Sequence, residues 1–278
     1  MNILEVTLLI FLIAAIAGFL GSLTGLGGGV VIVPALTLLF GVDIHYAIGA
    51  SLVSVIATSS GAAAAYVKEG YTNIRIGMFL ETATTTGAML GAVLAAIMSP
   101  SAIAIIFGAV LIYSAIQSSR ERVRLPTDEQ PDKLATRLSM NSSFPTTEGN
   151  RPYYVRRVPG GLGVMFVAGS LSGLLGIGSG AFKVLAMDQV MRIPFKVSTT
   201  TSNFMIGVTA AASAGIFLGR GYVDPGLAMP VMLGVLIGSH LGAKVLTGVK
   251  SITLRRVFGV VILALAIEMI YNGILGRV

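Results

Sequence analysis

The chain has 278 residues, of which 54% are hydrophobic and 11% are charged, and its formal net charge is +7. A soluble domain carries about 25% charged residues, so this composition excludes an ordinary water-soluble protein and is typical of one that resides in a lipid bilayer. The sequence contains no cysteine, which excludes disulfides and thiolate metal sites.

Apolar runs of helical length follow one another along the chain and predict its helices. A run of about 20 residues crosses the hydrocarbon core of a bilayer. The first run contains Glu5 and no basic residue, so we interpret it as a retained helix rather than a signal peptide. The predicted segments are 5–24, 30–41, 46–67, 75–98 and 102–118 in the first half and 159–175, 181–191, 197–219, 226–247 and 254–275 in the second. We therefore expect an all-α polytopic membrane protein with about eight to ten transmembrane segments.

The two halves are copies of one unit. Residues 151 positions apart match from the first helix to the last, a register that indicates an internal duplication. The matched pairs include Gly18 with Gly169, Gly25 with Gly176, Gly27 with Gly178, Gly29 with Gly180, Ser51 with Ser202, Thr58 with Thr209, Gly87 with Gly238 and Gly108 with Gly259. The chain is thus divided into a first membrane repeat, residues 1–118, a polar linker, residues 119–157, and a second membrane repeat, residues 158–278.

The basic residues predict how the chain is oriented. The linker carries eight of them, so a cytoplasmic loop explains the positive net charge better than nucleic-acid binding does. Its polar composition predicts a mobile loop rather than a domain. In the first repeat Lys68 and Arg75 flank the junction before segment 75–98, whereas in the second repeat Lys244 to Arg256 surround the next junction. The basic residues thus flank a different junction in each repeat, which predicts inverted repeats with both termini outside. Parallel repeats with four crossings each remain the alternative.

Each repeat contains a glycine-rich break between apolar helices. The breaks consist of Gly25, Gly27, Gly28 and Gly29 in the first repeat and of Gly176, Gly178, Ser179 and Gly180 in the second. Unwound backbone at membrane depth is tolerated where it is buried in protein or lines a cavity. Paired broken helices in inverted repeats indicate a substrate site near the middle of the membrane, and helix-terminal amides suit an anion. The alternative is that the glycines only permit close helix packing.

Polar residues follow both breaks. The candidate ligands of an anion are Ser51 in the first repeat and Thr199, Thr200, Ser202 and Asn203 in the second. Hydroxyls that bond their own helix carbonyls are the alternative. Lys183 lies inside an apolar segment, where a charge is costly and functional by default. Its alternative is a side chain that reaches the membrane interface.

Three residues in later helices are candidates for carrying a coupling proton: Glu81, His240 and Glu268. Glu81 is the first choice because threonines surround it, with a packing role as the alternative. Asp188 and Arg192, one helical turn apart, are expected to pair with each other, and His45 is expected to cap a helix rather than to bind a ligand.

With these features the chain resembles the sulfite exporter TauE/SafE family over nearly its whole length except the linker. The stretch from Gly25 to Pro34 matches the family's glycine-rich turn, apolar stretch and proline, whereas the second copy has Leu185, Ser179 and Lys183 at departing positions. The resemblance implies a multi-pass secondary transporter in the cell membrane. It implies sulfur-containing anions, such as sulfite or sulfonates, or related organic anions as substrates, exported by alternating access and driven by an ion or proton gradient.

Three other functions fit parts of the same sequence pattern. An anion channel shares the architecture, a serine hydrolase would use Ser179 with His240, and a scaffold would have no use for Lys183. The glycine breaks lack the Lys-Ser/Thr of a nucleotide-binding loop, so a gradient is the expected energy source. We expect no enzyme activity, cofactor, metal or nucleic acid. The expected partners are a small anion, a coupling ion or proton and the lipid bilayer, and a homo-oligomer is left open.

Overall fold

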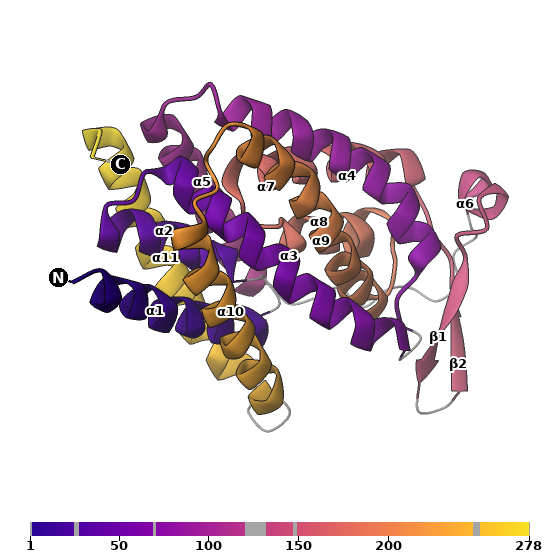
Figure 1. Cartoon of the computed structure of the whole chain (residues 1–278). Coiled ribbons are helices and arrows are strands. Elements are labelled where there is room, and N and C mark those ends of the chain that lie inside the picture. Colours follow the sequence, from indigo (N-terminus) through magenta and orange to yellow (C-terminus); the bar gives the residue numbers. More distant parts are fainter. Residues whose placement is uncertain are drawn as a thin grey trace.

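The protein is an all-α polytopic membrane protein with a small β-hairpin in its linker (Figure 1). The computed structural model describes residues 2–24, 28–68, 71–119, 132–146, 149–246 and 251–277. Within these residues, stretches of five helices are long and apolar enough to cross a membrane, namely those in α1, α4, α7, α9 and α10.

The helices lie within a few residues of the predicted segments. The first repeat contains α1 (Ile3–Thr24), α2 (Gly29–Phe40), α3 (Ile44–Lys68), α4 (Ile74–Ala95) and α5 (Pro100–Ser119). The second contains α7 (Val158–Leu175), α8 (Gly180–Leu185), the π-helical turn η1 (Ala186–Val190), α9 (Phe195–Gly219), α10 (Pro225–Leu246) and α11 (Ser251–Leu275). Local signals set several ends: Asn73 caps α4 by accepting from the Ile76 amide at 3.1 Å, and Gly41 ends α2 in the left-handed conformation.

The duplication is visible in how the helices pack. Shifting α3 and α4 by 151 residues gives the bounds of α9 and α10. The first helix of each repeat packs on the fourth helix of the other, α1 on α10 and α7 on α4. A Cβ atom at Gly18 would lie 2.5 Å from the Val235 carbonyl oxygen, and one at Gly169 would lie 2.1 Å from that of Thr84. Because these pairs are equivalent in the two repeats, the same backbone contact occurs twice, and both contacts require glycine.

The last helices of the two repeats, α5 and α11, run antiparallel against each other. A Cβ atom at Gly108 would meet Ala266 and Ile270, whereas one at Gly273, farther along α11, would meet Ser101 and Ile105, which come earlier in α5. These two equivalent helices therefore have opposite directions where they are in contact.

Part of the linker is folded, which differs from the mobile loop expected. It contains α6 (Lys133–Arg137) and a hairpin of β1 (Ser142–Thr146) and β2 (Gly149–Tyr153), and residues 120–131, with Arg120, Arg122 and Arg124, lie outside the described residues. Met140, Tyr153 and Val155 are buried. Asn73 donates to the Tyr153 hydroxyl at 2.7 Å, and burial raises the pKa of that hydroxyl. The overall composition of the linker does not predict that it packs on the helices, because only a few buried side chains in a polar segment make this contact.

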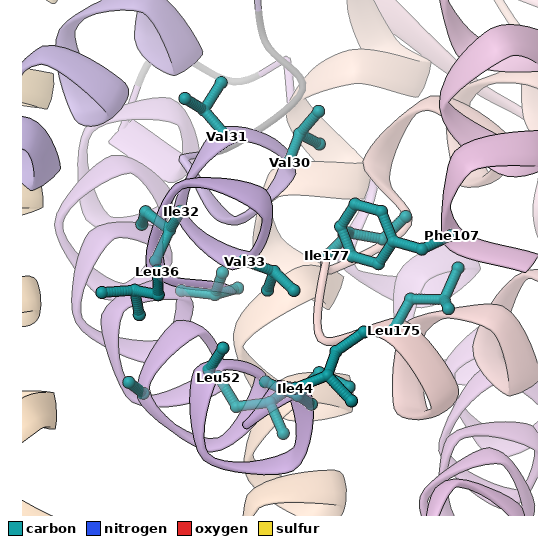
Figure 2. Packing of buried hydrophobic residues seen from close by; sticks show 14 of the residues in the cluster. Val30, Val31, Ile32, Val33, Leu36, Ile44, Leu52, Phe107, Leu175 and Ile177 are labelled. Carbon is teal, nitrogen blue, oxygen red and sulfur yellow. The ribbon is translucent and has the colours of Figure 1, made fainter. Parts of the chain in front are cut away.

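The core joins the two repeats. Figure 2 shows side chains of α2 and α3 in one cluster with Phe107 of α5 and with Leu175 and Ile177 at the second break. The hairpin lies at the opposite end of the molecule from both termini (Figure 1). Leu175 and Ile177 are buried in the core cluster, so the second break is packed inside the protein.

Candidate anion-binding site

The second glycine break is a stretch of left-handed backbone between α7 and α8. Gly176, Gly178 and Ser179 have φ angles of +67°, +69° and +46°. A Cβ atom at Gly176 would also lie 2.9 Å from Ile48 Cγ2, so a side chain there would be both strained and crowded. In the first break Gly28 and Gly29 are described, while Gly25 and Gly27 lie outside the described residues.

The first residue of α2 lies against the second break. A Cβ atom at Gly29 would lie 2.6 Å from Ser51 Oγ and 2.9 Å from the Gly176 carbonyl oxygen. Ser51 donates to that carbonyl at 2.7 Å, and its repeat equivalent Ser202 donates to the Gly180 carbonyl at 3.3 Å. The structure therefore brings together Gly29, Ser51 and Gly176 from the two repeats.

The hydroxyls at the start of α9 bond mainly to their own helix. Ser198 donates to the Ile193 carbonyl at 3.2 Å, Thr199 to Phe195 at 2.9 Å and Thr200 to Lys196 at 3.0 Å. Thr201 accepts from the Asn73 amide at 3.1 Å, and Asn203 is half-buried. In this conformation the Thr199 and Thr200 hydroxyls donate to carbonyls one turn back. This agrees with the alternative in which hydroxyls bond carbonyls of their own helix rather than an anion.

Lys183 is enclosed by the protein and linked to a carboxylate through one hydroxyl group. Its side chain has 0% exposure, and its ammonium donates to Thr209 Oγ1. Thr209 Oγ1 in turn donates to Glu81 Oε1 at 2.6 Å, and Glu81, 7% exposed, also accepts from Thr85 Oγ1 at 3.0 Å. The alternative in which Lys183 reaches the membrane interface is wrong, because the charge of Glu81 compensates the ammonium inside the protein.

The cluster of Lys183, Thr209 and Glu81, called here the charge cluster, joins residues that the sequence singled out separately. It lies where α4, α8 and α9 meet. Thr209 was noted only as the repeat of Thr58. The signal that could have revealed it is a stripe of hydroxyls on one face of α9, at Ser202, Thr209 and Ser213, which follow helical spacing.

Several buried polar atoms near this region lack a hydrogen-bond partner. They are Glu81 Oε2, Ser179 Oγ and Ser172 Oγ, all buried. Ser179 precedes Lys183 by one turn, since the Lys183 amide donates to the Ser179 carbonyl at 3.1 Å. Buried polar atoms are normally paired, so these three atoms have bonding capacity that a bound ligand can use.

The comparisons with known proteins agree with this architecture. The family model described as sulfite exporter TauE/SafE matches residues 10–269. The chain belongs to the sulfite exporter TauE/SafE family. It is 28% identical to the probable membrane transporter protein YunE of Bacillus subtilis over 273 residues, which are 96% of this chain and 98% of that protein. It is 29% identical to YdhB of the same organism over 90% of this chain and 93% of the relative, and 26% identical to a probable membrane transporter protein of Xylella fastidiosa over 93% and 92%. No solved structure matches the chain.

This TauE/SafE chain is a multi-pass membrane transporter, and its repeats differ in charge. The positions equivalent to Lys183, Glu81 and Thr209 by the shift of 151 are Ile32, Met232 and Thr58. Thr58 donates only to carbonyls of its own helix, those of Ser54 and Val55. The backbone is duplicated, but the charge cluster occurs once.

The remaining candidates lie elsewhere in this TauE/SafE structure. His240 on α10 and Glu268 on α11 are exposed. Ser179 is buried at the start of α8, which packs on α7 and α9, whereas α10 packs on α1 and α3, so the structure does not bring Ser179 and His240 together. His45 caps the C-terminal end of α4 rather than the start of α3, where Asp43 accepts from the His45 amide at 2.8 Å. The His45 ring bonds the Ala95 carbonyl at 3.0 Å and stacks on Tyr222. The pairing of Asp188 with Arg192 stays a prediction.

Proposed function

We propose that this protein is a secondary transporter that moves a small sulfur-containing anion across the cell membrane by alternating access, with a proton as the coupling ion. The charge cluster carries the proposal. A cation in the interior of a membrane protein is costly and marks a substrate or ion pathway. Lys183 offers that cation to an anion, and Glu81, bonded to the same hydroxyl, is the group that can accept the proton.

The positions around the break fit a small oxyanion. The left-handed conformation of Gly176, Gly178 and Ser179 interrupts the helix between α7 and α8, and the unpartnered hydroxyl of Ser179 lies one turn from Lys183. Peptide and hydroxyl donors replace water around an oxyanion without adding fixed charge, so the anion can also be released. Sulfite, sulfonates and thiosulfate have the small, oxygen-rich shape that such a site accommodates.

Two features support alternating access by inverted repeats. Equivalent helices α5 and α11 run antiparallel, which is the contact expected for repeats of opposite orientation. Each repeat also exchanges its first helix with the other, so α1 with α10 and α4 with α7 form two bodies that could rock about α3 and α9. The linker hairpin at the end opposite to both termini supports a cytoplasmic linker with both termini outside (Figure 1).

The test is ligand stabilisation of the purified protein. Sulfite, thiosulfate, sulfate, sulfoacetate and lactate are each added, and the thermal unfolding temperature is recorded. A ligand present at 100 times its Kd stabilises the folded state by about 2.7 kcal/mol. We expect a sulfur oxyanion to stabilise the wild type and Lys133→Ala, which changes an exposed linker lysine, but not Lys183→Ala.

The same variants in proteoliposomes test the carrier. Lys183→Met combined with Glu81→Gln removes both charges of the cluster, so its loss of anion binding cannot be ascribed to one unpaired buried charge. We expect counterflow of the stabilising anion with the wild type and Lys133→Ala, but not with Lys183→Ala or the double variant. If no anion shifts the unfolding temperature of the wild type, the substrate class is wrong. A steady ionic current instead of saturable counterflow would favour a channel.

A further inference from the structure

The charge cluster contains a hydroxyl with two acceptors, and this suggests how proton and anion are linked. We propose that Glu81 and the transported anion compete for Lys183 through Thr209, so that the site takes up one proton for each anion that it binds. The proposal rests on the proposed function and specifies its coupling. Its structural basis is the shared oxygen atom of Thr209.

Thr209 has one hydroxyl hydrogen and two acceptors within reach. Glu81 Oε1 lies 2.6 Å from Thr209 Oγ1, and the Met205 carbonyl of the preceding helical turn lies 3.0 Å from it. Since a hydroxyl donates one hydrogen bond, the two acceptors define two states. In the state with ionised Glu81, Thr209 donates to the carboxylate while it accepts from Lys183. When Glu81 is protonated, Thr209 can turn its hydrogen to Met205 and still accept from Lys183.

Charge balance connects these states to the anion. A buried ammonium without a counter-ion is unfavourable by several kcal/mol, so Lys183 requires one negative partner whenever it is charged. Ionised Glu81 supplies that partner when no anion is bound. Protonation of Glu81 removes it, and a monoanion at Lys183 restores it. The cluster is neutral in both states, so a protonated, anion-loaded site can change its exposure across the membrane without moving net charge.

The surrounding helices supply no other described charge that could take this role. The helix α7 carries no charged residue, and the one charge of α9, Lys196, is exposed and lies over the Tyr71 ring. On α4 the other charge, Arg75, donates to the Ser139 carbonyl at 2.9 Å. Asp188 lies on η1, and the ring of His45 on α3 is bonded to Asp43 and Ala95. Glu81 is the carboxylate whose charge acts on Lys183, and the Thr209 hydroxyl links the two groups by hydrogen bonds.

The unpartnered atoms fit the exchange. Glu81 Oε2 is buried and has no partner, so a proton can be bound there without breaking either of the bonds that Oε1 accepts. Ser179 Oγ, one turn before Lys183, can donate to the incoming anion. The proton and the anion thus have separate places in one cluster.

Proton counting by isothermal titration calorimetry tests the proposal. Methanesulfonate and ethanesulfonate serve as probes, because both are monoanions whose charge stays fixed between about pH 6 and 8, so any proton must be taken up by the protein. Titrations in two buffers with different ionisation enthalpies give the number of protons bound per anion. We expect about one proton per anion for the wild type and none for Glu81→Gln, which should still bind the probe. The control Thr58→Val changes the repeat equivalent of Thr209 and should match the wild type.

Equal proton uptake by wild type and Glu81→Gln would overturn the proposal while leaving an anion transporter in place. If neither probe binds the wild type, the substrate class of the proposed function is wrong. The link between Lys183 and Glu81 is then tested by measurements that need no ligand. In that case the unfolding temperatures of Glu81→Gln, Lys183→Met and the double variant are compared. We expect each single change to lower the temperature by several degrees and the double variant to recover most of the loss. If the decrease in unfolding temperature of the double variant equals the sum of the two single decreases, the charges are not coupled. The proposed competition for Lys183 would then be wrong.

Discussion

Thr209 stands between two buried charges, and its hydroxyl is the single group that satisfies both. The Lys183 ammonium donates to it and Glu81 accepts from it. In a low-dielectric interior such a chain of bonds is stronger than in water, and an incomplete chain is correspondingly costly. The stability of this region therefore depends on the hydroxyl group of Thr209.

Thr209→Val keeps the shape of the side chain and removes the hydroxyl. We expect a loss of about 1–3 kcal/mol in the free energy of unfolding, because Lys183 and Glu81 each lose a buried partner. Thermal unfolding in detergent measures this. The matched control is Thr58→Val, whose hydroxyl bonds only its own helix and whose loss should cost well under that amount. Equal losses in the two variants would contradict a special role of Thr209.

At the residue scale, the sequence predicted the ends of the charge cluster and missed its middle. Lys183 and Glu81 were conspicuous because charges are rare in apolar segments. Their meeting through Thr209 was not predictable, since Glu81 and Thr209 lie 128 positions apart and no local pattern connects them. The Thr199 and Thr200 hydroxyls looked like ligands, yet in this conformation they bond carbonyls one turn back, because helical geometry offers those acceptors first.

At the element scale, the close approach of α7 to α4 depends on glycine at defined positions. Gly169 and Gly173 of α7 face the Thr84 and Ala88 carbonyls. Helix bounds could be predicted because apolar length, glycine breaks and Pro194 mark them locally. The exchange of first helices between repeats could not, since equivalent helices in the two repeats have similar composition and nothing local selects the partner.

Gly169→Ala tests this contact. Its methyl group would have to displace the Thr84 carbonyl, which lies 2.1 Å away, and such overpacking costs typically about 1–3 kcal/mol. Gly163→Ala on the same helix meets nothing within 4 Å and provides the control. We expect a lower unfolding temperature for Gly169→Ala and an unchanged or slightly higher one for Gly163→Ala, since alanine favours helices. A tolerated Gly169→Ala would mean that α7 does not pack this closely on α4.

At the scale of the whole molecule, the linker fastens the repeats to each other. Asn73 at the start of α4 donates to Tyr153, and the Arg156 amide donates to the Met191 carbonyl at 3.0 Å, just after η1. The linker between residues 132 and 157 thus contacts both repeats. Because η1 packs on α7 and α7 packs on α4, both contacts belong to the body of α4 and α7, and we expect the linker segment to move with that body.

Asn73→Ala removes the bond to Tyr153 and the cap of α4 together. We expect faster cleavage of the linker by trypsin, because the backbone after Arg137 and Arg156 becomes accessible more often when the hairpin detaches. Asn150→Ala, an exposed position on β2, is the control and should be cleaved like the wild type. Gel electrophoresis of timed digests gives the rates. Identical rates for both variants would mean that Asn73 does not hold the hairpin.

The orientation of the repeats can be tested directly, because the natural sequence contains no cysteine and each introduced one is unique. Inverted repeats with an odd number of crossings place Leu4 and Gly276 outside and Asn150 in the cytoplasm, whereas four crossings per repeat place all three on the same side. Leu4→Cys and Gly276→Cys should therefore react with a membrane-impermeant maleimide in intact cells. Asn150→Cys should react only after permeabilisation. Labelling of all three positions on one side would reject the inverted arrangement, and with it the rocking of two opposed bodies around the charge cluster.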